Sequence, residues 1–117
     1  MSFELINNGI FIKQGNTASF DLKFNIDITG STIYFTAKKE LKDKIPLISK
    51  LIINHLDPVN GLTTIDLAKE DTNCRTGKYL FDIQLALPDG QVHTVFPKGA
   101  RQMGELIITP TITPVRQ

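Results

Sequence analysis

The sequence contains no tryptophan, a single cysteine and no long apolar run, and each absence excludes a class of protein. A lone cysteine, Cys74, cannot form a disulfide within the chain, which favours a reducing compartment or assembly inside a cell. The apolar stretches reach only a few residues, far below the about 20 that span a bilayer. The first residues also lack the basic stretch and apolar run of a signal peptide. We therefore expect a soluble protein, made in a cytoplasm, with no membrane partner.

An excess of charge of one sign is also missing. The chain has 13 basic and 12 acidic residues, a formal net charge of +1. Dedicated nucleic-acid binders carry a clustered basic excess, because neutralised phosphates supply most of their affinity. Where lysines crowd, in residues 38–44, Glu40 and Asp43 stand among them, and mixed charges cancel beyond about one Debye length. The sequence predicts no nucleic-acid partner.

Residues suited to catalysis or metal binding are few and scattered. His55 and His93 are the only histidines, and no closely spaced Cys/His set offers a zinc site. The chain has no D-x-D-x-D calcium loop, no serine in a G-x-S-x-G elbow and no glycine-rich phosphate loop. We expect no metal, no cofactor and no enzymatic activity. The enzymatic alternative requires that the fold bring His93, Cys74 and an aspartate together.

What the chain does contain is alternation of apolar and polar residues. Tyr79, Phe81, Ile83 and Leu85 recur at every second position, which places them on one face of a strand. Similar runs rich in Ile, Thr, Phe and Val lie between short turn motifs. The pattern predicts strands at residues 10–13, 17–28, 32–38, 47–54, 62–67, 77–87, 91–96 and 105–109.

Turn chemistry predicts how some of these strands connect. Asp89 and Gly90 favour a tight hairpin between residues 77–87 and 91–96. The turn at residues 57–61 predicts a second hairpin, between residues 47–54 and 62–67. Strands punctuated at about 8–12 residues indicate an all-β fold, a single immunoglobulin-like antiparallel β-sandwich of about seven to nine short strands. We expect one domain over residues 1–117, in which residues 110–117 form a short tail because Pro110 and Pro114 end regular pairing.

The segment before the alternating strand predicts a structural corner. A tyrosine at the start of a strand, just after a turn, resembles the corner that closes immunoglobulin-like sandwiches. Tyr79 holds this position, and Gly77 supplies the turn before it. Asp71 and Thr72 favour a capped helical turn that crosses the end of the sandwich.

The order of these signals resembles small phage and prophage tail proteins of Gram-positive hosts. It is similar to the N-terminal domain of the baseplate upper protein family over nearly the whole chain. Two features depart from that family's pattern, namely Asn16, where an acidic residue is usual, and the long loop at residues 97–103. The matching segments are residues 13–16, 27–38, 71–72, 77–79, 81–85, 89–90 with Thr94, 107–109 and 112–113.

This resemblance implies a virion structural protein of the tail or baseplate, assembled in the host bacterial cytoplasm, with no catalytic residues. Its partners would be other tail or baseplate proteins and further copies of itself. The alternative is a carbohydrate- or ligand-binding module of immunoglobulin-like fold, with Tyr34 as an exposed aromatic residue. The strand at residues 47–54 and the loop at residues 97–103 are more apolar or longer than folding requires. The candidate interaction residues are Leu47, Leu51, Ile53, Pro97, Met103 and Tyr34.

Overall fold

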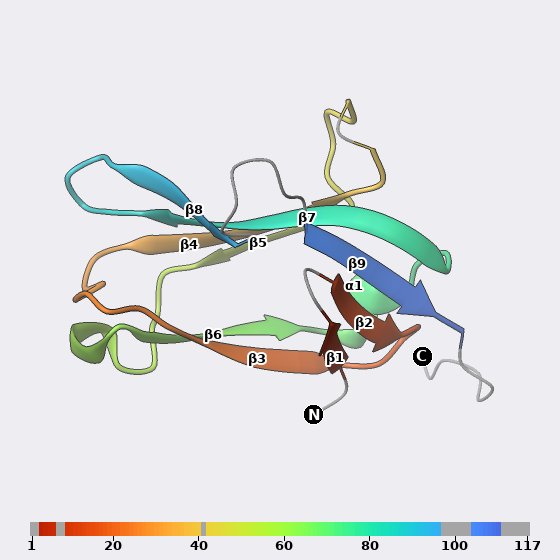
Figure 1. Cartoon of the computed structure of the whole chain (residues 1–117), viewed down its shortest axis with the longest axis horizontal. Coiled ribbons are helices and arrows are strands. Elements are labelled where there is room, and N and C mark those ends of the chain that lie inside the picture. The colour runs from red at the N-terminus through yellow and green to blue at the C-terminus, as the bar shows by residue number, and fades with distance from the viewer. Residues whose placement is uncertain (1–2, 7–8, 41, 97–103, 111–117) are drawn as a thin grey trace.

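The protein folds as two facing layers of strands with an apolar core between them (Figure 1). The structure, a computed structural model, describes residues 3–6, 9–40, 42–96 and 104–110. One layer is a seven-stranded sheet and the other is a two-stranded sheet. Among the described residues, no helix has the length and apolar character to cross a membrane. The predicted all-β sandwich is confirmed.

The nine strands of the described residues are close to the predicted set, with one addition before residue 9. The larger sheet has the order β1 (Phe3–Ile6), β2 (Gly9–Lys13), β9 (Gly104–Thr109), β7 (Gly77–Ala86), β4 (Thr32–Lys38) and β5 (Ile48–Ile52), and β8 (Val92–Phe96) also pairs with β7. The smaller sheet pairs β3 (Ala18–Lys23) with β6 (Leu62–Leu67). Two short helical turns are η1 (Pro58–Asn60) and α1 (Lys69–Thr72).

This strand order follows that of immunoglobulin-like sandwiches. The run β5-β4-β7-β9 takes the order C′-C-F-G of one sheet, and β3 and β6 take the places of strands B and E in the other. The expectation of antiparallel pairing holds for every described strand pair except β2 with β9, which is parallel. The strands β2 and β9 are far apart in the sequence and no hairpin joins them, so they can pair in parallel.

The predicted hairpin between residues 47–54 and 62–67 is wrong. The strand β5 pairs with β4, whereas β6 pairs with β3 in the other sheet. The turn at residues 57–61 closes only locally, through two hydrogen bonds between Asp57 and Leu62 of 2.9 and 3.0 Å. His55 lies where the chain crosses between the layers, and its ring nitrogens contact Thr63 Oγ1 at 2.9 Å and the Ser31 carbonyl oxygen at 2.7 Å.

The predicted strand at residues 17–28 is shorter than expected, because β3 ends at Lys23. Beyond it, the amide of Phe24 donates to the Gly61 carbonyl oxygen at 2.8 Å, so the chain packs on the η1 turn. Gly61 has φ +75°, and an added Cβ would lie 2.3 Å from the Phe24 carbonyl oxygen, so this close approach requires glycine. Ile26, which lies beyond the end of β3, is 50% exposed.

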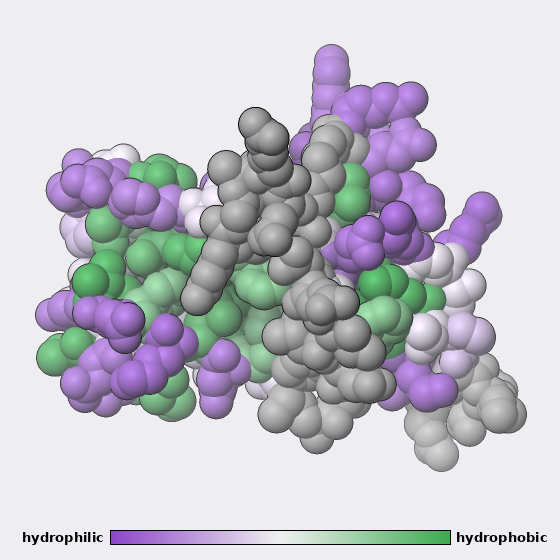
Figure 2. All heavy atoms as spheres, viewed as in Figure 1, coloured by the Kyte–Doolittle hydropathy of each residue, from purple (hydrophilic) through white to green (hydrophobic). Residues whose placement is uncertain are grey.

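The core is built from the inward faces of both sheets, as the alternation predicts. At the left end of the view in Figure 2, hydrophobic residues lie between the hydrophilic outer residues of the two layers. Phe35 of β4 stacks on Phe81 of β7 with ring centroids 5.3 Å apart, and Phe20 of β3 meets Phe35 edge-on at 6.0 Å. Phe81 also stacks on Phe96 of β8 at 5.4 Å. A continuous chain of four aromatic rings therefore connects the smaller sheet to the edge of the larger one.

The predicted corner forms at the start of β7. Tyr79 is buried, and its hydroxyl donates a hydrogen bond to the Arg75 carbonyl oxygen four residues upstream. Burial, together with the neighbouring Cys74, raises the pKa of Tyr79. Gly77 has φ +140°, and Lys39 Nζ lies 5.0 Å from the centroid of the Tyr79 ring. This geometry is that of the tyrosine corner of immunoglobulin-like folds.

The other predicted member of the corner, Asp71, caps the short helix α1. Its carboxylate accepts a hydrogen bond from the Ala68 amide at 2.7 Å. The Thr72 hydroxyl donates to the Asn16 carbonyl oxygen at 2.6 Å, which ties α1 to the turn between β2 and β3. The predicted tail at residues 110–117 lies outside the described residues except for Pro110.

We expect Tyr79→Ala to lower the free energy of unfolding by about 3–5 kcal/mol, because it removes a buried aromatic ring. The matched variant Tyr79→Phe keeps the ring and loses only the bond to Arg75, so it should cost about 0.5–1.5 kcal/mol. Urea unfolding followed by circular dichroism measures both values. A loss below about 1 kcal/mol for Tyr79→Ala would contradict the role of the corner.

Candidate interaction surface

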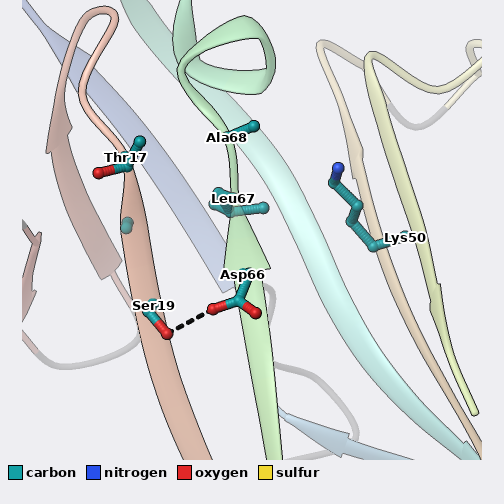
Figure 3. A pocket seen from close by; sticks show the side chains of 7 residues that line it. Thr17, Ser19, Lys50, Asp66, Leu67 and Ala68 are labelled. Atoms are coloured by element: carbon teal, nitrogen blue, oxygen red, sulfur yellow. Dashed lines mark hydrogen bonds between the residues drawn. The ribbon is translucent and has the colours of Figure 1, made fainter. Parts of the chain in front are cut away.

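A shallow groove lies where the two sheets diverge, between β6 and β5 (Figure 3). Its volume is about 610 Å³, and Thr17, Ala18, Ser19, Lys50, Asp66, Leu67 and Ala68 line it. The ammonium group of Lys50 forms an ion pair of 2.7 Å with the Asp71 carboxylate, which connects the edge of the larger sheet to α1. None of the described residues that line the groove is aromatic. It therefore lacks the stacking surface on which sugar-binding sites depend.

The outer face of the larger sheet carries a wide uncharged area at one end. In the antiparallel register, Tyr34 of β4 lies between Leu51 of β5 and Gln84 of β7, and Gln84 pairs with Thr94 of β8. The row beside it pairs Thr32 with Ala86 and Ala86 with Val92. These side chains point outward because the alternate residues of β4 and β7 are buried in the core. We call this set the uncharged patch: Thr32, Tyr34, Leu51, Gln84, Ala86, Val92 and Thr94.

Charged residues lie at the other end of the same face. Asp82 pairs with Thr36 of β4 next to the uncharged patch, and Lys78 of β7 forms an ion pair of 3.3 Å with Glu105 of β9. Burial raises the pKa of Asp82, and the nearby Lys38 partly opposes this effect. The face is therefore divided into an uncharged half and a charged half along the strand direction.

Four of the six predicted interaction residues are exposed as expected. Leu51 is 59% exposed, Ile53 61%, Leu47 45% and Tyr34 37%. Tyr34 and Leu51 lie side by side in the register, and Leu47 and Ile53 flank β5 on either side. The predicted residues Pro97 and Met103 lie outside the described residues.

The patch is completed by five residues that were not among the predicted interaction residues: Thr32, Gln84, Ala86, Val92 and Thr94. The hairpin motif at Asp89 and Gly90 sets which residues of β7 and β8 face each other. This motif was the feature of the sequence from which the β8 part of the patch could have been predicted. The amide of Gly90 donates to the Leu87 carbonyl oxygen at 3.0 Å, which closes the turn as predicted.

The chemistry-bearing residues of the described chain do not converge. His93 of β8 pairs with Leu85 near one end of β7, whereas Tyr79 and the neighbouring Cys74 lie near the other end. Six residues of strand separate Tyr79 from Leu85, which is a distance of about 20 Å. The required contact between His93 and Cys74 is therefore excluded. No group of three or more His, Cys, Asp or Glu residues in the described part of the chain is placed to hold a metal ion.

We expect Asp82→Asn to stabilise the folded chain at neutral pH, because burial makes the carboxylate costly to ionise. A raised pKa in the folded state favours folding while Asp82 is protonated, and this contribution disappears as pH rises through that pKa. The two proteins should therefore have similar stability below pH 3.8, the ordinary pKa of the group, and diverge above it. Thermal unfolding from pH 3 to pH 8 measures the difference. A constant difference over this range would contradict the assignment.

A comparison of the chain with protein-family models and with curated proteins finds no match.

Proposed function

We propose that this protein is a structural component that acts by assembling with other proteins, in the tail or baseplate of a phage or prophage virion. The observation that carries the proposal is the uncharged patch, which extends over β5, β4, β7 and β8 on one side of the sandwich. It has no charged side chain among its seven residues.

The composition of the patch is typical of a protein interface. Leu51 is 59% exposed and Val92 56%, and the aromatic ring of Tyr34 lies between their strands. Its apolar members are Tyr34, Leu51, Ala86 and Val92, and exposed apolar side chains that gather on one face are associated with binding sites. The centres of protein interfaces are depleted of charge and enriched in tyrosine, which this patch reproduces. Lys38, Asp82 and Lys78 then form a polar rim on one side.

The resemblance to the N-terminal domain of the baseplate upper protein family supplies the setting. The structural proteins of an assembled particle are held together by protein interfaces, for which the uncharged patch is the candidate here, and the corner at Tyr79 belongs to the segments in which the resemblance is densest. We therefore propose other tail or baseplate proteins as partners, with further copies of the same chain.

The proposal predicts that the protein is part of the assembled particle. Gold-labelled antibodies against the chain should bind the tail or baseplate of particles purified after induction of the host, because a structural component stays in the virion. Electron microscopy locates the label, and particles from a host in which the gene is deleted serve as the control. Purified intact particles without label, and without the chain by mass spectrometry, would contradict the proposal.

The alternative function, carbohydrate binding, depends on Tyr34. Tyr34 is exposed on the flat sheet face, beside Leu51, and lies outside the groove. If the alternative holds, a glycan array should show binding that Tyr34→Ala abolishes and that Val92→Ala leaves intact. We expect no such binding, because a single tyrosine on a flat face gives a sugar only one stacking contact.

A further inference from the structure

The strand β5 is an edge of the larger sheet with no charge on its outward face. Among the described residues it pairs with β4 on one side only. Its outward side chains are Ser49 and Leu51, and the apolar residues Leu47 and Ile53 flank it. Exposed edges of this kind offer unpaired backbone groups to another strand, and proteins ordinarily protect them with charges or proline.

The edge strand β3 of the smaller sheet contrasts with β5. The strand β3 carries Asp21 and Lys23 on its exposed face, and Asp66 of β6 lies beside it, where it accepts a hydrogen bond from Ser19. The edge strand β3 therefore carries charges on its exposed face, whereas the outward face of β5 carries none.

The only charge of β5 does not oppose pairing. Lys50 points inward, away from Leu51, and its ammonium group forms the 2.7 Å ion pair with Asp71. An inward-pointing lysine often protects an edge, because a second strand would bury it without a partner. Here the compensating carboxylate comes from the same chain, so a second strand beside β5 leaves no charge unpaired.

We propose that two copies of the chain pair through β5, antiparallel, about a two-fold axis at Leu51. This proposal rests on the proposed assembly function and specifies how one contact is made. In this register Leu51 faces Leu51 of the second copy, Ser49 faces Ile53, and Lys50 faces Ile52. An axis at Lys50 would instead set the two lysines opposite each other, and like charges directly opposite are destabilising.

Pairing of this kind joins the two larger sheets into one. A two-fold interface uses the same surface of both copies, so a single strand is sufficient to form it. Tyr34 lies one strand away from β5, so the uncharged patches of the two copies become one continuous surface. The outward face of the dimer then presents a double-width surface to a further tail or baseplate protein.

The test uses charge at the axis. Size-exclusion chromatography with light scattering should show a dimer of the wild-type chain. Leu51→Lys and Leu51→Glu should each weaken dimerisation by at least about tenfold, because each sets two like charges opposite one another. A mixture of the two variants should recover the dimer, because opposite charges then meet at the axis. Thermal unfolding shows whether each variant stays folded, as expected for a side chain that is 59% exposed.

The control variant is Val92→Lys, which places the same charge on the same face, three strands away from β5. It should leave the dimer intact if the contact is edge to edge. Loss of the dimer in Val92→Lys as well as in Leu51→Lys would show that the contact is not confined to the β5 edge and would overturn the β5 pairing. A monomeric wild-type chain, or mixed variants that fail to recover the dimer, would overturn it too. Gold labelling of particles is independent of these results, so a monomer found in the virion refutes β5 pairing and leaves the proposed function standing.

Discussion

The packing of the two sheets depends on the contact of Phe35 with Phe81 and Phe20. Immunoglobulin domains usually place a disulfide between strands B and F against a tryptophan on strand C. Here the corresponding strands β3, β7 and β4 carry Phe20, Phe81 and Phe35, and the chain has one cysteine and no tryptophan. Tyr79 stands two residues before Phe81, the spacing that separates the corner tyrosine from the second cysteine in immunoglobulin domains. Ring contacts that run from Phe20 through Phe35 to Phe81 therefore stand where those domains have a disulfide and a tryptophan.

Much of this fold was predictable from alternation alone. The buried faces of β4 and β7 follow directly from the alternation around Phe35 and Phe81, because in a strand only every second side chain can point into the core. The connection after β5 was not predictable, because the turn at residues 57–61 has the composition of a hairpin whether or not its flanking strands pair. Whether it joins partners or passes to the other sheet depends on contacts distant in sequence, such as those of His55 with Ser31 and Thr63.

The candidate surface was predictable only in part, for a related reason. The lack of charge around Leu51 is visible in the sequence, but the patch appears only when β4, β5, β7 and β8 are placed in register. Lys50 shows the limit most clearly. In the sequence it is an ordinary strand lysine, and only the fold reveals that Asp71, on the short helix after β6, neutralises it. From the sequence, the charge of Lys50 is expected to protect the β5 edge against pairing, but in the fold this charge is already neutralised by Asp71.

The parallel pair of β2 and β9 has a consequence for how the chain folds. The hydroxyl of Thr109 contacts the carbonyl oxygen of Ile12, a partner 97 residues away in sequence. During synthesis, the edges of β2 and of the first half of β7 that pair with β9 have no partner until β9 leaves the ribosome. Contacts of such long range are slow to form, and open strand edges in the meantime invite pairing with other chains. Strand β9 thus closes the larger sheet, and a chain without it would leave two edges of that sheet open at once.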